Sequence, residues 1–332
     1  MVVWCKVLFF FDRLDLDRRF RLLRKEVEVR GVSEELRGWC FDSPPVEPPS
    51  RSVLFGVGEL AMRYCQSMRD IYLKRVLNVK PPPTIKMARG IVLHAVNRES
   101  LSAVKRLLFS GEARSGSELV EDLLPLAKDV VDRAILEAER ALFAKVSETE
   151  ERQLRVEASA FYRFLIVQAA ARIDQAISKY PHSDVDSIIS VAVPPVVERK
   201  VDGSLIGLSR GLSVDIYTPF NAIADLKTGE IREFHPYAAT GYALALEAEE
   251  NIPVDFGFII YVQIEPSRLV PSFRLKYFVI GDELRREFLE IRDETYEIVS
   301  VGRDPGKPAK CPDYCPYYSV CVRESVEAPR HK

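Results

Sequence analysis

Three cysteines lie close together near the end of this chain, in the run KCPDYCPYYSVC, and a fourth lies far upstream in RYCQSMRDIYLKR. Cys311, Cys315 and Cys321 are separated by three and then five residues, whereas Cys65 precedes them by 245 intervening positions. Three neighbouring thiolates and a remote one provide the four sulfur ligands of a zinc ion or of a [4Fe–4S] cluster. The spacing alone is compatible with both. Either site would join the two ends of the molecule.

A second group of residues, between these cysteines, has the chemistry of a metal-dependent nuclease. Asp215 lies in one expected strand, and the triplet Asp225, Leu226, Lys227 lies in the next. Because side chains alternate along a strand, Asp225 and Lys227 share one face and Leu226 turns into the core. Two aspartates provide hard oxygen ligands for Mg²⁺ or Mn²⁺, which polarises a phosphodiester and lowers the pKa of an attacking water. The lysine could orient that water or offset developing negative charge.

His94 lies on an expected helix that begins near Met87, and its imidazole would favour Mn²⁺ over Mg²⁺. Taken alone, a D-x-K triplet is more often a solvated strand face, and a lone helical histidine is more often structural. The strand context and the cysteine set together favour the metal site.

The elements that must position these residues follow from hydrophobic periodicity. We expect a charged helix within 1–42, helices at 58–76, 117–146, 154–177, 235–250 and 282–299, and strands at 187–193, 196–201, 212–218, 222–228, 256–264 and 272–280. This order predicts an α/β protein with a sheet of mixed pairing. Five segments are expected: a helical segment and proline-rich linker (1–50), the Cys65 and His94 helices (51–115), a helical insertion (116–184), a core sheet with helices (185–300) and the cysteine segment (301–332).

Composition limits the function classes. The chain has 332 residues, 47% hydrophobic and 29% charged, with a net charge of −2, so no global basic field attracts nucleic acid. DNA contacts would have to come from local clusters, such as the basic group formed by Arg63, Arg69, Lys74 and Arg75. The apolar start MVVWCKVLFFF is too short to span a membrane, so we expect a cytoplasmic protein without a membrane segment.

Taken together, these motifs make the chain similar to a known family, the CRISPR-associated RecB-like iron–sulfur nucleases of the Cas-four type, in the archaeal branch called Csa-one. The resemblance extends from about residue 57 to 324 and rests on YCQSMRDIYLKRV, ARGIVLH, GLSVDIY, IADLKTG and CPDYCPYYSVC. The spacing agrees as well, with 29 positions from Cys65 to His94 and ten from Asp215 to Asp225.

The resemblance implies a restriction-endonuclease-like core with a PD-(D/E)XK site. It implies Mn²⁺ or Mg²⁺ bound by His94, Asp215, Asp225 and the carbonyl of Leu226, catalysis by Lys227 with Tyr242 in the same site, and a [4Fe–4S] cluster on Cys65, Cys311, Cys315 and Cys321. The chain departs from the family pattern at three positions. Cys311 and Cys315 are three rather than two residues apart, Leu212 replaces a glycine, and Ala238 replaces the glutamine of a Q-x3-Y motif, so that only Tyr242 matches.

Several nearby side chains have two interpretations. Glu198 could approach the metal or remain a solvated edge carboxylate. Tyr242 could contact DNA or pack its helix on the sheet. Tyr314, Tyr317 and Tyr318 could stack on unpaired bases or cover the cluster, and the basic group around Cys65 could be a solvated helix face.

We therefore expect a metal-dependent DNA nuclease that trims DNA during CRISPR spacer acquisition. The alternatives are a non-catalytic DNA-binding or scaffold subunit of the adaptation complex and a RecB-like repair exonuclease. The expected partners are single-stranded DNA or DNA ends, the CRISPR integrase and a paralogous adaptation nuclease, with the helical insertion as the docking surface.

Overall fold

A six-stranded sheet forms the centre of the computed structural model, which describes residues 2–3, 13–265 and 270–321. Among these residues the strand order is β1-β6-β5-β4-β3-β2, with β4 and β5 parallel and the other neighbours antiparallel. The strands are β1 (Val2–Val3), β2 (Val196–Val201), β3 (Leu212–Thr218), β4 (Ala222–Lys227), β5 (Phe256–Ile264) and β6 (Pro271–Val279). The α/β class and the mixed pairing expected from the sequence are confirmed.

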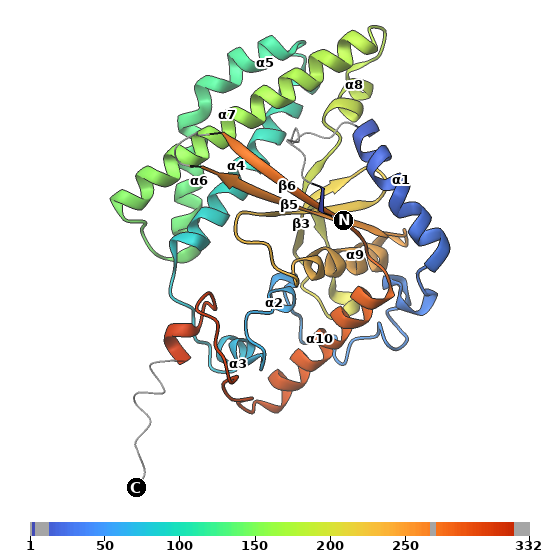
Figure 1. Ribbon diagram of the computed structural model, residues 1–332, viewed down its shortest axis with the longest axis vertical. Helices are drawn as coiled ribbons and strands as arrows, with labels where there is room; N and C mark the ends of the chain where they lie inside the picture. The colour runs from blue at the N-terminus through green and yellow to red at the C-terminus, as the bar shows by residue number, and fades with distance from the viewer. Residues whose placement is uncertain (1, 4–12, 266–269, 322–332) are drawn as a thin grey trace.

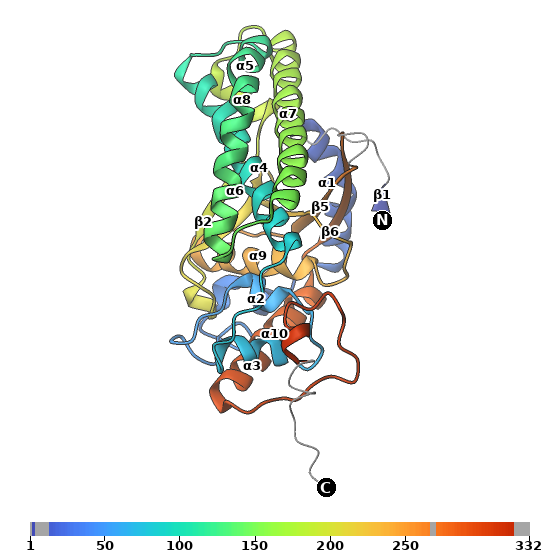
Figure 2. The same ribbon diagram turned by 90° about the vertical axis from the view of Figure 1, so that its left-hand side faces the viewer.

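Helices cover the sheet on both sides (Figure 1). The helices are α1 (Arg13–Arg30), α2 (Val57–Ala61), α3 (Arg69–Arg75), α4 (Ile85–Ser110), α5 (Gly116–Leu123), α6 (Ala127–Leu142), α7 (Glu148–Lys179), α8 (Val185–Ala192), α9 (Pro236–Glu250) and α10 (Asp282–Val301). Figure 2 shows α5 to α8 at one end of the molecule and α3, α10 and the cysteine segment at the other. The sheet and α9 lie between these two ends.

The helices of the expected insertion share a hydrophobic core with the sheet. Phe161 and Phe164 on α7 lie 6.3 and 5.2 Å, between ring centroids, from Phe273 on β6. Phe161 is fully buried in the same cluster as Val92 of α4 and Leu226 of β4. Residues 116–184 therefore contribute to the main core rather than standing apart from it.

Three sequence expectations about secondary structure are wrong. Residues 187–193 are not a strand: Asp184 caps a helix by accepting a hydrogen bond from Ser187 N at 2.7 Å, and α8 buries Ile188, Ile189 and Ala192. Tertiary packing overrides the β-branched composition here. The helix expected at 58–76 is two short helices, with Cys65 in the connection. The helix expected at 117–146 is interrupted by a 3₁₀ turn at Pro125.

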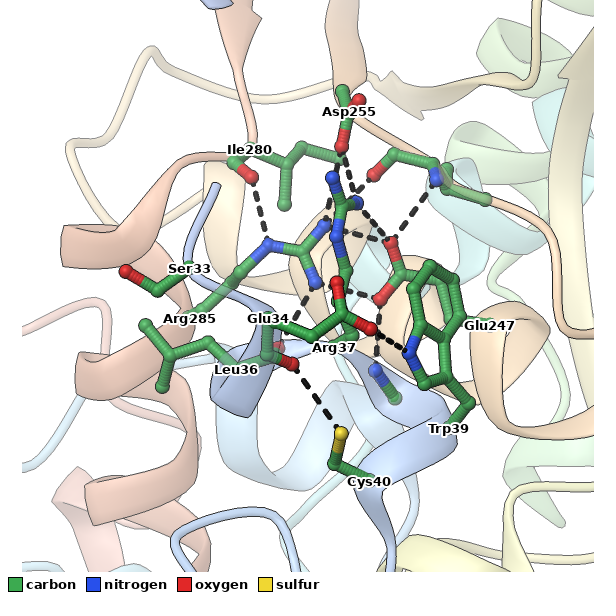
Figure 3. A network of polar contacts seen from close by, with 12 residues as sticks. Ser33, Glu34, Leu36, Arg37, Trp39, Cys40, Glu247, Asp255, Ile280 and Arg285 are labelled. Atoms are coloured by element: carbon green, nitrogen blue, oxygen red, sulfur yellow. Dashed lines mark hydrogen bonds and ion pairs between the residues drawn. The ribbon is translucent and has the colours of Figure 1, made fainter. Parts of the chain in front are cut away.

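A buried ionic network fastens the N-terminal segment onto the core (Figure 3). Glu247 of α9, fully buried, accepts hydrogen bonds from Arg285 Nη1 and Nη2 at 2.7 and 2.8 Å, and from Arg37 Nη1 at 2.8 Å. The backbone N–H groups of Gly38 and Val254 donate to the same carboxylate. Burial by itself raises the pKa of Glu247, but these hydrogen bonds outweigh it and hold the pKa below its usual value.

No helix within the described parts of the chain combines the length and the apolar composition that a membrane crossing requires.

Candidate functional site

Three carboxylates lie in a row across β2, β3 and β4. The register pairs Ile216 with Ala224, which places Asp215 and Asp225 opposite each other one position further on. It also pairs Val197 with Ile216 and Arg199 with Val214, so Glu198 lies opposite Asp215. The backbone N–H of Leu226 donates to Asp215 Oδ2 at 3.2 Å. The alternation expected in the D-x-K strand is present, because Leu226 is fully buried in the core on the other face.

Asp225 is the most deeply buried acid of this row, with 4% of its surface exposed. Burial raises its pKa to about 6; Lys227 opposes this shift, and Asp215 reinforces it. Lys227 Nζ lies 2.7 Å from Asp225 Oδ2 as an ion pair, yet that oxygen has no well-oriented hydrogen bond among the described residues. The site thus holds more negative charge than its own lysine satisfies.

His94 reaches this row from α4. Thr84 caps that helix by accepting a hydrogen bond from Met87 N at 3.3 Å, after the proline run that ends the preceding segment. Ten residues beyond the cap, His94 Nδ1 lies 3.4 Å from Asp215 Oδ2. The structure therefore brings together His94, Asp215, Asp225 and Lys227 from three elements.

Two further side chains border the row. Tyr242 of α9 is partly buried, and its pKa is raised by burial first and then by Asp215, Asp225 and Glu198, so its hydroxyl stays protonated beside them. Glu198 has a left-handed backbone, with φ 54°, and its carboxylate accepts a hydrogen bond from Ser213 Oγ at 2.5 Å. A non-glycine residue at positive φ inside a strand is strained, and this strain lies directly opposite Asp215.

The donor set fits a divalent cation. Two carboxylates, an imidazole and a nearby backbone carbonyl are hard or borderline ligands suited to Mg²⁺ or Mn²⁺. The two aspartates carry more negative charge than the single ammonium of Lys227 offsets, so the site attracts a cation. Within the described residues no three His, Cys, Asp or Glu side chains are already arranged around a common centre. Lys227 and the Leu226 N–H instead contact the two aspartates.

The cysteine segment packs against α3. Cys321, Tyr317 and Leu73 form a small buried cluster with Cys315 at its edge, and Tyr317 Oη donates to the carbonyl of Val79 at 3.2 Å. Ser67, two residues after Cys65, donates to the carbonyl of Gly306 at 2.6 Å. Cys65 and Cys321 both act on the pKa of Cys315, which places Cys65 near these two C-terminal cysteines. Within the described residues no three of the cysteines are arranged around a common centre.

The thiols form a donor set that fits a soft metal site. Burial raises the pKa of Cys315 to about 11, and Asp70, Cys65 and Cys321 act in the same direction against a backbone hydrogen bond at Tyr317. Cys311 is partly buried at the start of the same segment, and all four cysteines are free thiols. Four sulfur donors suit iron–sulfur or zinc equally.

Most of the basic group near Cys65 is engaged within the protein. Arg69 is 7% exposed, forms a fork onto Asp304 at 2.9 and 2.8 Å, and donates from Nη1 to Cys321 Sγ at 3.3 Å. Lys74 and Arg75 both pair with Glu59, and Arg63 lines a pocket of about 410 Å³. Burial argues against a phosphate contact for Arg69, whereas Lys74 remains half exposed.

Sequence reasoning missed two roles here. It grouped Arg69 with the basic residues that could meet phosphates, and no signal in the sequence indicates that Arg69 is buried against Asp304 and Cys321. It also left out His235, which is buried with its Nδ1 3.0 Å from Tyr261 Oη on the strand beside Lys227. The adjacent Phe234 contacts Tyr64, which in turn contacts Tyr314 of the cysteine segment.

Comparison with known proteins decides the family. Residues 9–324 match the family "CRISPR-associated exonuclease Csa1". Two curated relatives with that description are each 34% identical: one from Thermoproteus tenax over 306 residues (91% of this chain, 96% of the relative) and one from Saccharolobus solfataricus over 315 residues (93% and 97%). The chain belongs to the CRISPR-associated exonuclease Csa1 family. The resemblance drawn from the five motifs is confirmed, and this family's members align along nearly the whole chain, including the N-terminal segment that the motifs did not reach.

Proposed function

We propose that this chain is a metal-dependent DNA nuclease that trims DNA ends during CRISPR spacer acquisition, on a core of the PD-(D/E)XK type. The observation that carries the proposal is the meeting of Asp215, Asp225, Lys227 and His94, from β3, β4 and α4, with Asp225 buried and paired to Lys227. The family's description as exonucleases supports the same conclusion.

In this proposal His94, Asp215, Asp225 and the Leu226 carbonyl would hold Mn²⁺ or Mg²⁺, and the bound ion would supply Lewis acidity toward a phosphodiester. Lys227 then leaves its contact with Asp225 and directs its ammonium toward the phosphate oxygens, where negative charge develops. Tyr242, kept protonated by its acidic neighbours, is placed to donate a hydrogen bond to the DNA end. The buried position of Asp225 strengthens its electrostatic interactions with the cation and with Lys227.

The second proposed cofactor is a [4Fe–4S] cluster on Cys65, Cys311, Cys315 and Cys321. The family resemblance favours iron–sulfur over zinc. Because these cysteines join the segment before α3 to the segment after α10, the cluster would act as a covalent clip between distant parts of the chain. Metal and sulfide analysis of protein purified without oxygen separates the two: about four irons and four sulfides are expected, and zinc without sulfide overturns this assignment.

The proposed partners are DNA ends, the CRISPR integrase and a paralogous nuclease. At a net charge of −2, binding to DNA alone should be weak and salt-dependent, so tethering by a subunit would raise the effective concentration of substrate. The outer face of α7 offers a docking surface, since Val156 and Val167 are 47% and 45% exposed beside a groove of about 550 Å³. Val156→Glu with Val167→Glu should abolish co-purification with the integrase, and undiminished capture would move the interface elsewhere.

The direct test is a nuclease assay on the purified chain with single-stranded and end-labelled duplex DNA. Cutting should require Mn²⁺ or Mg²⁺, stop with chelator and disappear in Asp215→Asn, whose fold should be intact by circular dichroism. If the wild-type protein never cuts, alone or with its partners, the chain is instead a DNA-binding or scaffold subunit.

A further inference from the structure

One arginine connects three elements that meet at the end of the D-x-K strand. Arg89 of α4 places its Nε 2.6 Å from Glu157 Oε2 of α7, and its Nη1 donates to the backbone carbonyl of Thr228, the residue that follows Lys227. Helix α4 approaches closely at this point, because a Cβ on Gly90 would lie 3.7 Å from Thr228 Oγ1. The fork of a single guanidinium thus joins the helical segment 116–184 to the strand that carries the lysine.

The Thr228 carbonyl lies one residue beyond the end of strand β4. The ladder between β4 and β5 ends at the pair Lys227 and Tyr261, so the next carbonyl has no strand partner in that ladder. A Cβ placed on Gly229, the next residue, would meet no atom within 4 Å. A buried or half-buried carbonyl needs a donor, and Arg89 provides it. Arg89 of α4 therefore contacts the chain just where it leaves the sheet after Lys227.

Glu157 holds that arginine in place. Its side chain is 5% exposed, and its second carboxylate oxygen accepts a hydrogen bond from Gln153 Nε2 at 2.9 Å, one turn earlier on α7. A buried, charge-assisted contact of this kind fixes geometry more strictly than a surface ion pair. His94 lies on the same helix as Arg89. The contacts of Arg89 therefore connect the helix that carries His94 to the strand that carries Lys227.

We propose that Arg89 and Glu157 are positioning residues for Lys227, through which the helical segment 116–184 takes part in catalysis without touching a reacting atom. The inference rests on the proposed function. A lysine aimed at developing charge acts only when it is placed within a fraction of an ångström, so a small shift of the Thr228 carbonyl lowers the rate while DNA binding is unchanged.

The test uses conservative variants, because removing Arg89 outright would strand a buried carboxylate and could unfold the chain. Arg89→Lys keeps the charge but cannot contact Glu157 and Thr228 at once, and Glu157→Gln removes the charge that orients the guanidinium. Arg98→Lys and Glu137→Gln are matched controls: Arg98 is another α4 arginine, with Nη2 2.6 Å from Glu137 Oε2 of α6.

We expect kcat to fall at least tenfold in Arg89→Lys and Glu157→Gln, with KM for DNA and Mn²⁺ affinity within twofold of wild type. The double variant should be no worse than the poorer single variant, because both act through one contact. Wild-type kcat in Arg89→Lys, an equal loss in the Arg98→Lys control, or a parallel fall in Mn²⁺ affinity would each overturn the proposal.

A second readout separates this inference from the proposed function. Amide hydrogen exchange of the peptide covering 222–235 should accelerate in Arg89→Lys and Glu157→Gln and stay unchanged in both controls, whether or not the wild-type chain cuts DNA. Unchanged exchange in all four variants shows that the contact does not position the strand end. If the wild-type chain does not cut DNA but the exchange rates change as expected, the proposed nuclease function and the catalytic role of Arg89 are both excluded. Arg89 then has a structural role only.

Discussion

Lys227 Nζ lies 2.7 Å from Asp225 Oδ2, and the two side chains leave the same face of β4 with Leu226 buried behind them. The ammonium therefore neutralises in part the carboxylate that the proposed cation would bind. One lysine can thus serve two states of the site, as the counter-ion of Asp225 without metal and as the group that faces phosphate oxygens during reaction.

Replacing this lysine should separate metal binding from catalysis. Lys227→Met removes the ammonium and leaves Asp225 without its counter-ion, so we expect Mn²⁺ affinity to stay the same or rise while kcat falls roughly 100-fold, the loss typical of removing one transition-state donor. Mn²⁺ titration by electron paramagnetic resonance and single-turnover cutting measure the two effects. Cutting at the wild-type rate, or a loss of Mn²⁺ binding, would show that Lys227 has another role.

Arg69 should influence the proposed cluster through Cys321. Its Nη1 donates to the Cys321 sulfur at 3.3 Å, and a positive donor at a ligand sulfur stabilises the reduced, more negative form of a cluster. Arg69→Lys should lower the reduction potential, on the order of 60 mV if the lost contact is worth about 1.4 kcal/mol. Arg75→Lys, on the same helix but forked onto Glu59, is the control. A redox titration in which both variants match wild type would exclude this role.

His235 should contribute a loss of stability in mild acid, opposite in sign to the contribution of Asp225, whose raised pKa favours the folded state as the pH falls. Burial first, and then Lys227, lower the pKa of His235 to about 4, below the ordinary value of 6.5. Between these values the unfolded chain binds a proton that the folded chain does not, so this contribution to stability is complete above pH 6.5 and decreases as the pH falls toward 4. The slope is at most about 1.4 kcal/mol per pH unit.

His235→Gln should remove that slope, whatever its effect on absolute stability. Urea unfolding at pH 6.5, 5.5 and 4.5 measures it, and His182→Gln, at an exposed position, should keep the wild-type slope. If the His235→Gln slope equals that of wild type, the histidine is protonated in the folded protein and its pKa is not lowered.

The sequence predicts the parts of the site that depend on strand geometry. Alternation within Asp225-Leu226-Lys227 and the position of Asp215 one strand earlier were sufficient to bring these residues together, because register and pleat leave little freedom. The contacts of Arg69 and Arg89 could not be predicted in the same way. Each depends on the backbone carbonyl or sulfur of a segment more than a hundred residues away, and an arginine in a helical pattern does not indicate whether it faces solvent or a distant loop.

Residues 187–193 show that contacts with distant parts of the chain also limit the prediction of secondary structure. Their composition favours a strand, but the Asp184 cap and the burial of Ile188 and Ile189 against the helical core select a helix. The difference in local propensity between strand and helix is smaller than the free energy of burying two isoleucines, at roughly 1.5–3 kcal/mol each. Tertiary packing therefore decides the secondary structure of this segment.

The ionic network around Glu247 connects the N-terminal segment to the core, so the loss of one of its arginines should lower the stability of the protein. Arg37 Nη1 lies 2.8 Å from Glu247 Oε1 and 2.5 Å from Asp255 Oδ1, while Arg285, fully buried, forms a fork onto both carboxylate oxygens of Glu247. Arg37→Met should leave the fork intact and cost about 3 kcal/mol of unfolding free energy, because a buried carboxylate loses one of its two cationic partners. Arg21→Met, whose salt bridge with Asp17 on α1 is 69% exposed on the arginine side, should cost less than about 1 kcal/mol.

The same substitution should release the segment itself. Residues 33–56 contact the core through this cation, through Gly38, whose Cβ position would lie 2.0 Å from the Leu244 carbonyl oxygen, and through the buried side chains of Leu36, Val46 and Phe55. The carbonyls of residues 45–47 also accept hydrogen bonds from Arg292. Without the Arg37 contact we expect trypsin to cleave Arg51 faster in the native protein, while the sheet stays protected. Cleavage at the wild-type rate in Arg37→Met would mean that the packing of Gly38 and of the other buried side chains holds the segment without the Arg37 contact.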